Sequence, residues 1–284
     1  MTLACIPVLL VGIAAYHLYT NFIINMTEKS SIETIDLVCD DIDSLLNDAW
    51  NLCDMLTGDI KMQKYLRMDF DSVRDQYSND LAGSMELASI STYRKDIFGV
   101  YVFGQNGGRY KSNYYSFKSE DQRETTWYKT IAGSRETTWF PSHEGSFIVR
   151  SSISDNFITV GQPVMDKASG MVNGIVAADI KEDVITQRIK HSLSNGVICI
   201  IDQEGSILFR SNAGNDLHYP IDISPSLVSH ILESTGTAVG KSMVVPDSGY
   251  LVVSRTLMTE TLPGIALPEI CHPTTGSHLC HFPF

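Results

Sequence analysis

The first 25 residues constrain this chain more than any other stretch. No charged residue occurs from Leu3 to Ile24, and the few polar side chains gather toward the C-terminal end of the segment. A helix of this length is about 30 Å long, which matches the hydrocarbon thickness of a bilayer. We therefore predict a transmembrane helix over residues 1–25, which would hold the protein in the cell membrane.

Two other interpretations of this segment stay open, a cleaved signal peptide and a buried core helix. No basic residue precedes the apolar run, and the run is longer than the apolar region of most signal peptides. Both features favour a retained helix. The first basic residue is Lys29, so charge does not indicate the orientation in the membrane.

A long helical pattern follows the apolar segment. From Ile32 to Leu56 the apolar residues recur at steps of three and four, acidic residues fill the other faces, and no proline interrupts the pattern. Gly58 is a plausible end. This pattern predicts a stalk helix that leaves the bilayer, although a surface helix of a globular domain would show the same stripe. With a second helix from about Phe70 to Thr92, it makes up the region 26–95.

The residues from 96 to 181 change to a strand pattern. A run of β-branched and aromatic residues leads into Asn106-Gly107, a strong hairpin signal, and then into a tyrosine-rich run. After the hairpin we predict a short helix and three strands, over Glu124–Ala132, Ser146–Ser152, Phe157–Val164 and Val172–Ile180. Two strands, a helix and an antiparallel run form the order of a PAS-like module.

The residues from 182 to 258 repeat this order less completely. We predict a connecting helix, a hairpin, a short helix and two more strands, over Glu182–Leu193, Gly196–Ser211, Pro225–Glu233, 236–245 and 249–257. The last strand of a full module is not evident. The tail 259–284 continues neither pattern and is predicted to be irregular. The fold class is therefore α+β, with a membrane helix, a stalk helix and two tandem PAS-like antiparallel-sheet modules, the second incomplete.

Four segments carry a resemblance to a known family. They read WYKTI, WFPSHEG, ITVGQPVMD and GIVAADI, over Trp127–Ile131, Trp139–Gly145, Ile158–Asp166 and Gly174–Ile180. Together and in this order they resemble the double Cache extracellular sensor domains of bacterial membrane receptors. The resemblance covers roughly Ile32 to Thr256, about four fifths of the chain. The segment that begins at Trp139 looks most similar to Gram-positive sensor histidine kinases, the receptors of two-component systems.

The resemblance implies a sensory function rather than an enzymatic one. In such proteins the membrane-distal module, here residues 96–181, binds a small molecule outside the cell, and a homodimer through the stalk helix passes a conformational signal across the membrane. The output domain would follow a second membrane helix, and this sequence contains neither. We therefore expect a single-pass membrane protein whose bulk is extracellular, the sensory part of a receptor.

The resemblance also suggests where a ligand would bind. Trp127, Tyr128 and Trp139 stand where the family lines its pocket, although buried tryptophans such as Trp127 and Trp139 are more often core aromatics than ligand contacts. A carboxylate can hold an ammonium group and a guanidinium can hold a carboxylate. The full set of candidate ligand-binding residues is Tyr101, Trp127, Tyr128, Trp139, His143, Arg150 and Asp179.

Three positions depart from the amino-acid-binding pattern of that family. Thr125 stands where the pattern has arginine, with Arg123 as the nearest arginine in the sequence. His143 stands in place of a tyrosine, and Gly145 in place of an aspartate. A specificity for amino acids therefore does not follow from the resemblance alone.

Other function classes find little support. The formal net charge of -12, with no cluster of basic residues, argues against nucleic acid as a partner. No nucleotide loop, nucleophile elbow or kinase signature occurs, and we expect no cofactor. The tail holds five soft ligand types, but their spacing matches no common zinc module, so we expect no metal; they are Cys271, His272, His278, Cys280 and His281.

The alternative function is a secreted or membrane-tethered hydrolase or adhesion module without a sensory role. A hydrolase would need a catalytic constellation, and Ser142-His143-Glu144 contains suitable residue types. Adjacent side chains on a strand point to opposite faces, which argues against a triad at that place.

Overall fold

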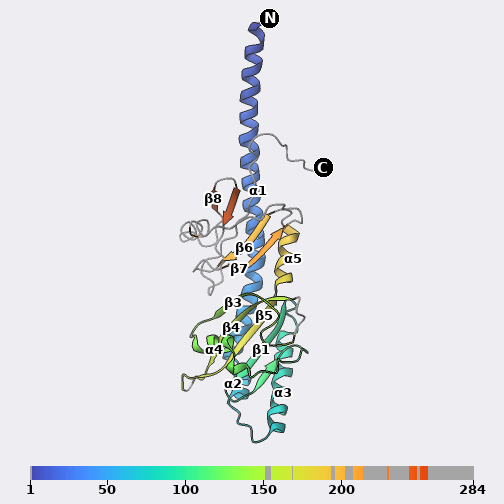
Figure 1. The fold of residues 1–284 in the computed structure, drawn as a ribbon, viewed down its shortest axis with the longest axis vertical. Helices are drawn as coiled ribbons and strands as arrows, with labels where there is room; N and C mark the ends of the chain where they lie inside the picture. Colours follow the sequence, from blue (N-terminus) through green and yellow to red (C-terminus); the bar gives the residue numbers. More distant parts are fainter. Residues whose placement is uncertain are drawn as a thin grey trace.

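The structure is a computed structural model that describes residues 2–150, 155–167, 169–192, 196–201, 207–213, 229, 243–247 and 250–254. Helix α1 runs without a break over Thr2–Gly58. It projects at its N-terminal end beyond the rest of the molecule and continues along the sheets (Figure 1). The helix predicted from Met26 to Thr57 is thus confirmed as part of α1, and Gly58 is its last residue.

The part of α1 that lies along the sheets buries one stripe of side chains. The stripe repeats at steps of three and four, as the sequence pattern predicts, and comprises Val38, Ile42, Leu45, Leu46, Ala49, Leu52, Cys53 and Leu56, none of them more than 2% exposed. They join one apolar core with side chains of the central sheet. Within the described part of the chain, no helix holds an 18-residue stretch apolar enough to cross a bilayer.

A five-stranded antiparallel sheet forms the centre of the larger module. Its strands are β1 Ile97–Gly104, β2 Arg109–Lys111, β3 Thr138–Glu144, β4 Asn156–Met165 and β5 Val172–Lys181. Their order across the sheet is β2-β1-β5-β4-β3. The hairpin at Asn106-Gly107 is confirmed by the pairing of β1 with β2, and Gly107 adopts the positive φ of 89° that its turn requires.

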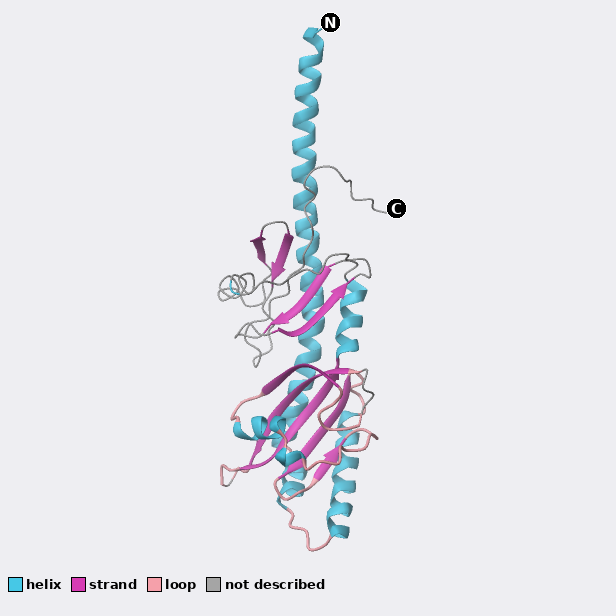
Figure 2. Ribbon diagram, in the orientation of Figure 1, coloured by secondary structure: helices cyan, strands magenta, loops and turns pink. Residues whose placement is uncertain are grey.

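Helices cover both faces of this sheet (Figure 2). One face packs against α1, α2 Ile60–Arg67 and α3 Val73–Ser91. The other packs against α4 Thr126–Gly133. Strand alternation assigns each side chain to a face: Val100 and Val102 belong to the α1 core, whereas Tyr101 and Phe103 belong to the α4 core.

In this module one strand prediction was wrong, and strand β3 and helix α2 were not predicted. The strand predicted over Ser146–Ser152 is absent from its described residues, where Val149 makes only an isolated bridge to Phe117. The hydroxyl of Ser146 accepts hydrogen bonds from the amides of Ile148 and Val149, which curls the backbone away from a ladder. Helix α2 was not predicted; Asp59 starts it by accepting a hydrogen bond from the amide of Met62.

The second module begins with α5 Glu182–Ser192, which confirms the predicted connecting helix. The predicted hairpin is present as β6 Gly196–Ile201 paired with β7 Ile207–Ala213, and β8 Met243–Asp247 pairs with β9 Tyr250–Ser254. β6 and β7 lie nearer the N-terminal end of α1 than the five-stranded sheet does (Figure 1). The tail 259–284 and, except for residue 229, the helix predicted over Pro225–Glu233 fall outside the described residues.

The α+β class with antiparallel sheets is confirmed. The division of the chain at residues 95, 181 and 258 stays a prediction.

Candidate ligand-binding site

The candidate site lies on the α4 face of the five-stranded sheet, opposite α1. Here β1 and β5 meet α4 and the loop from Gly145 to Arg150, and aromatic side chains fill the space between them. Phe103 is the centre of this aromatic cluster and contacts the rings of Phe117, Trp127 and Tyr128 edge-on. Edge-to-face contacts of this kind favour a dry, specifically packed site.

Helix α4 places two of the candidate residues in the cluster. Its apolar face turns Trp127, Tyr128 and Ile131 toward the sheet, where they are 7%, 3% and 0% exposed. Gly161 on β4 leaves room for this close approach, because a Cβ there would lie 2.3 Å from Ile131 Cδ1. The position of α4 against the sheet therefore depends on the absence of a side chain at residue 161.

The polar ends of the two aromatic residues are unpaired. In the part of the chain that the structure describes, neither Trp127 Nε1 nor Tyr128 Oη has a hydrogen-bond partner, although both atoms are buried. Burial raises the pKa of the Tyr128 phenol to about 12, so the hydroxyl stays protonated and can donate. A buried donor without an acceptor costs roughly 1–3 kcal/mol. Each of these two donors, on adjacent residues of α4, is able to bind an acceptor.

Asp179 on β5 is the buried acidic group of the site. It is 0% exposed, and its carboxylate accepts hydrogen bonds from Ser146 Oγ at 2.5 Å and from Thr159 Oγ1 at 2.6 Å. Burial raises the pKa of Asp179 to about 6, while the two hydroxyl donors and the charge of Lys118 oppose that rise. This carboxyl group therefore keeps its proton to a higher pH than an ordinary aspartate does.

Tyr101 and His143 complete the polar group around Asp179. The Tyr101 hydroxyl accepts a hydrogen bond from Asn113 Nδ2 at 2.9 Å and is also hydrogen-bonded to Asp179. His143 contacts the carbonyl oxygen of Gly145 through Nδ1 at 2.8 Å and Thr159 Oγ1 through Nε2 at 3.0 Å. Burial lowers the pKa of this imidazole.

A local irregularity in β3 brings His143 to this face. The register between β3 and β4 shifts between Phe140 and His143, around Pro141. In a regular strand Phe140 and His143 would point to opposite faces, but the shift turns both toward the α4 face. Phe147 then stacks on the His143 ring, with centroids 3.6 Å apart, and runs parallel to Trp127 at 6.4 Å.

The structure thus brings five of the seven candidate residues together: Tyr101, Trp127, Tyr128, His143 and Asp179. Trp139 does not join them, because it packs against the α1 core on the opposite face. Arg150 is exposed, and its backbone amide donates to Ser116.

Sequence reasoning missed Ser146, Thr159 and Phe147. Thr159 had a usable signal, because it is a polar residue between Ile158 and Val160 in a mostly apolar strand. It lies directly opposite Asp179 in the β4–β5 register. Ser146 and Phe147 had no such signal, since they reach the site from a loop.

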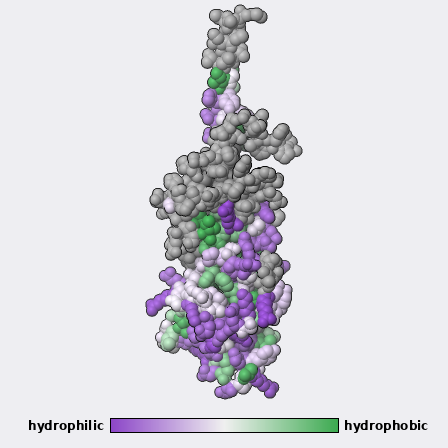
Figure 3. Space-filling model, viewed as in Figure 1, coloured by the Kyte–Doolittle hydropathy of each residue, from purple (hydrophilic) through white to green (hydrophobic). Residues whose placement is uncertain are grey.

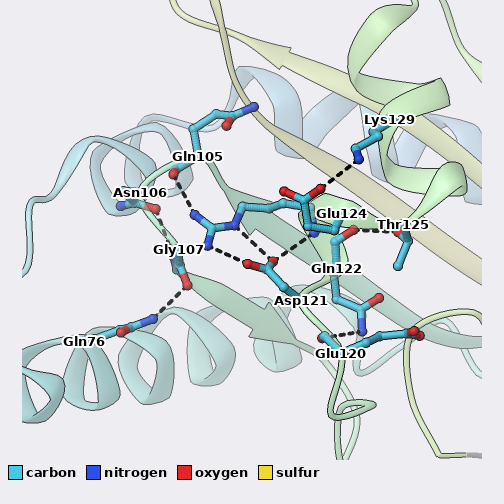
Figure 4. A network of polar contacts seen from close by, with 12 residues as sticks. Gln76, Gln105, Asn106, Gly107, Glu120, Asp121, Gln122, Glu124, Thr125 and Lys129 are labelled. Carbon is cyan, nitrogen blue, oxygen red and sulfur yellow. Dashed lines mark hydrogen bonds and ion pairs between the residues drawn. The ribbon is translucent and has the colours of Figure 1, made fainter.

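Arg123, the nearest arginine to the position that Thr125 fills, is engaged elsewhere. Its guanidinium donates to both carboxylate oxygens of Asp121, at 3.1 and 2.7 Å, and to the carbonyl oxygen of Gln105 at 3.2 Å. Figure 4 shows this network at the hairpin of β1 and β2, with Lys129 bound to Glu124 beside it. The cation that acts on both Asp179 and His143 is instead Lys118.

The sequence Ser142-His143-Glu144 does not form a catalytic triad. The hydroxyl of Ser142 donates to Glu182 at 2.5 Å, whereas His143 contacts Thr159 and Gly145. A serine nucleophile needs its base within hydrogen-bond reach. This geometry gives no support to the hydrolase interpretation.

Two surface grooves lie away from the aromatic cluster. One, of about 420 Å³, follows α2 and includes Gln63, Lys64 and Arg67. The other, of about 300 Å³, lies between α1 and the residues that precede β1, at Leu45, Asp48 and Arg94. None of the seven candidate residues lines either groove.

Comparison with known proteins finds likeness in structure rather than in sequence. No family model and no curated protein matches this sequence. The sensory domain of the Campylobacter jejuni chemoreceptor Tlp3 with isoleucine bound has 13% identity and a TM-score of 0.59, over 89% of this chain and 95% of that chain. The ligand-binding domain of the Pseudomonas fluorescens chemoreceptor CtaA in complex with L-valine has 12% identity and a TM-score of 0.52, over 89% and 100%.

A third solved structure extends the same comparison. The ligand-binding domain of the Pseudomonas aeruginosa amino-acid chemoreceptor PctC, in complex with GABA, has 16% identity and a TM-score of 0.50, over 86% of this chain and 99% of that chain. At such low identity the likeness is one of fold. It confirms the double Cache fold that the four sequence segments resemble.

Proposed function

Because this chain has the fold of the sensory domains of bacterial chemoreceptors, we propose that it is the extracellular ligand-sensing domain of a membrane receptor. In this proposal the module around the five-stranded sheet binds a small molecule on its α4 face, and the chain itself catalyses no reaction. The ligand-binding residues are Tyr101, Trp127, Tyr128, His143 and Asp179. Whether the output is a histidine kinase of a two-component system, as the sequence resemblance implies, belongs to the same proposal.

The donors of Trp127 and Tyr128, which have no hydrogen-bond partner among the described residues, are the single observation that carries this proposal. Two buried donors without acceptors are costly to a folded protein, and a ligand that supplies the acceptor removes that cost. Phe147, which stacks on both His143 and Trp127, links these donors to the group around Asp179. The site therefore has hydrogen-bond donors at one end, which suit an anionic ligand group, and the Asp179 carboxylate at the other, which suits a cationic one.

Such a site suits a small zwitterion. Asp179 would accept from an ammonium group, and the indole and phenol would donate to a carboxylate. The neighbours' ligands, isoleucine, L-valine and GABA, have both groups. At the carboxylate end the nearby cation is Arg123, whose charge acts on the Tyr128 phenol although its guanidinium is bound to Asp121, whereas Lys118 acts on Asp179 at the other end.

The candidate residues are closed off from solvent, so ligand entry requires local movement. Asp179, Trp127 and Tyr128 are all buried. We assign this movement to the loop from Gly145 to Arg150, which carries Ser146 and Phe147 over the site.

A thermal-shift screen of the purified full chain tests the proposal. The probes are the protein amino acids, GABA and a set of dicarboxylates and simple amines. A ligand at 100 times its Kd adds about 2.7 kcal/mol to the free energy of unfolding, which is a readily measured rise in Tm. No shift with any of these probes would contradict binding of a small zwitterion.

Variants then locate the ligand. Asp179→Asn is expected to abolish the shift, while Glu182→Gln, which alters a carboxylate bound by Ser142 instead, should keep it. Arg150→Ala and Trp139→Phe test the two candidate residues that lie apart from the cluster, and both should keep the shift. Equal loss of the shift in Asp179→Asn and Trp139→Phe would place the ligand elsewhere.

We also propose that α1 anchors the protein in the cell membrane as a single span and pairs with a second copy through the stalk. Many described side chains of its projecting part are apolar and exposed, and Figure 3 shows a hydrophobic patch on the rod with hydrophilic residues below it. They include Val11, Ile13, Tyr16, Leu18, Tyr19, Phe22 and Ile23, between 41% and 72% exposed. Large exposed apolar patches mark membrane or protein contacts.

Fractionation and cross-linking test this second proposal. The full chain should resist carbonate extraction from membranes, and a chain lacking residues 1–25 should be extracted. Leu37→Cys, on an exposed face of the stalk, should form a disulfide between copies, whereas Tyr114→Cys in the β2–α4 connection should not. Identical extraction of both chains would refute the anchor, and cross-linking at both positions alike would refute pairing through the stalk.

A further inference from the structure

Asp179, Thr159 and His143 form a continuous chain of hydrogen-bonding groups across three strands. Thr159 Oγ1 lies 2.6 Å from Asp179 Oδ1 and 3.0 Å from His143 Nε2. The other ring nitrogen, Nδ1, lies 2.8 Å from the carbonyl oxygen of Gly145. Asp179 and Thr159 are fully buried, and His143 is partly so.

The number of protons in this series of hydrogen bonds follows from which atoms can donate and which can only accept. A carbonyl oxygen only accepts, so Nδ1 of His143 must carry a proton. Thr159 has a single hydroxyl proton. If that proton points to Asp179, Nε2 must donate to Thr159, and the chain holds an imidazolium and a carboxylate. If it points to Nε2, the carboxyl group must donate to Thr159, and both ends are neutral.

The two arrangements contain the same number of protons and satisfy every hydrogen bond in the chain. A neutral His143 beside an ionised Asp179 would leave lone pairs facing one another, either at Gly145 or at Thr159. The protonation states of the two residues are therefore linked by geometry.

Ser146, which is hydrogen-bonded to the other carboxylate oxygen of Asp179, does not offer an alternative place for this proton. Ser146 Oγ already accepts the amides of Ile148 and Val149, at 3.1 and 3.2 Å, so its own proton goes to Asp179 Oδ2 at 2.5 Å. The mobile proton consequently belongs to the side of the carboxyl group that faces Thr159.

We propose that Asp179 and His143 share one proton through the hydroxyl of Thr159, so that the charge the site presents to a ligand is set by this pair as a unit. Loss of the shared proton to solvent leaves a net charge of -1, which favours a cationic ligand group. Gain of a second proton from solvent leaves +1, which disfavours it. This consequence for ligands rests on the proposed function, whereas the shared proton itself does not.

The surroundings keep the two proton sites close in energy. Burial raises the pKa of Asp179 and lowers that of His143, which moves the two groups toward each other. Lys118 favours the ionised carboxylate and disfavours the imidazolium. Tyr101 from β1 is hydrogen-bonded to Asp179, and the buried thiol of Cys53 on α1, whose pKa is raised, experiences the charge of Asp179.

Nuclear magnetic resonance of the full-length protein without ligand tests whether His143 and Asp179 share this proton. The ring nitrogens of histidine and the carboxyl carbons of aspartate are labelled and followed from pH 4 to pH 9. We expect Nδ1 of His143 to stay protonated throughout, and Nε2 to move in the same steps as the carboxyl carbon of Asp179. Separate midpoints for the two residues, each fitted by an independent titration, would overturn the proposal.

Substitution of the bridging residue gives a second, independent criterion. Thr159→Val removes the hydroxyl at nearly constant volume, and it should separate the midpoints of His143 and Asp179, while Thr159→Ser should restore the common steps. Glu182→Gln is the matched control and should leave both titrations unchanged. If Thr159→Val leaves them unchanged as well, no proton is shared through residue 159. Because no ligand is added, these outcomes do not depend on whether any small molecule binds.

Discussion

Asn79 on α3 and Tyr110 on β2 are joined by a buried hydrogen bond of 2.6 Å between the amide nitrogen and the phenol oxygen. The same phenol donates to the carbonyl oxygen of Tyr65 on α2 at 3.1 Å. Gly83, one turn further along α3, has no room for a Cβ, because that atom would lie 2.3 Å from the Tyr110 ring. One side chain of the edge strand therefore fixes two helices on the α1 face of the sheet.

Tyr110→Phe should destabilise the protein without changing the site. The substitution leaves the buried Asn79 amide without its acceptor, which costs roughly 1–3 kcal/mol. Denaturant unfolding of the full chain measures this loss. Tyr93→Phe, at a position 90% exposed, is the matched control and should be neutral. A loss below 0.5 kcal/mol in Tyr110→Phe would show that water replaces the missing partner.

Gly174→Ala should weaken the pairing of β1 with β5. The new Cβ would lie 2.2 Å from the backbone oxygen of Phe103, and backbone cannot move aside as a flexible side chain can. We expect a loss of roughly 1–3 kcal/mol, as for other overpacked sites. Gly133→Ala, at the end of α4 with nothing within 4 Å, should cost little or nothing. Equal stability of the two variants would contradict the close approach at residue 174.

Trp127→Phe should separate ligand recognition from folding. Phenylalanine keeps most of the ring contacts with Phe103 and Phe147 but removes the unpaired Nε1 donor. The ligand-free protein should lose less than about 1.5 kcal/mol, since removal of an unsatisfied donor offsets the lost area. The stabilising shift of a carboxylate ligand should fall markedly. A full ligand shift in this variant would mean that the indole donor is not a ligand contact.

The contribution of Asp179 to the stability of the ligand-free protein should fall between pH 4 and pH 7. The folded pKa of about 6 lies above the ordinary value of 3.8, so the folded state binds this proton more tightly than the unfolded state. The stabilisation is fully present below pH 3.8 and is lost as the pH rises through 6. Two pKa units correspond to about 3 kcal/mol.

Asp179→Asn isolates this contribution from those of other acidic groups. As the pH rises across this interval, the unfolding free energy of the wild-type protein should fall relative to that of Asp179→Asn. Urea unfolding of both proteins at pH 4, 5, 6 and 7 gives that difference directly. A constant difference over the four values would mean that Asp179 titrates as it does in the unfolded chain.

Local pattern was sufficient for most of the fold. The three- and four-residue steps from Val38 to Leu56 identify α1 and its buried stripe, because a helix brings such positions onto one face. Asn106-Gly107 identifies the β1–β2 hairpin, because few other dipeptides adopt its turn. The segments around Ile158 and Gly174 identify β4 and β5 by their continuous apolar character.

The candidate site depended on contacts that no local pattern contains. Trp139 and His143 both looked like ligand residues, yet the register shift at Pro141 leaves Trp139 on the α1 face and turns His143 toward Asp179. Ser146 bends the backbone through two amides, so that the described residues of the predicted strand, from Ser146 to Arg150, form a loop over the site.

The sequence by itself therefore determined most of the helices and strands, because these follow from periodicity over neighbouring residues, and four short segments carried the double Cache resemblance. Only the tertiary structure decided which polar atoms are paired. Asp179 receives its hydroxyl partners from residues 33 and 20 positions away, and the unpaired donors of Trp127 and Tyr128 become apparent only once the surrounding side chains have excluded water. Burial and hydrogen-bond pairing are properties of the packed protein. They determine the charge of the site and which of its donors lack an acceptor.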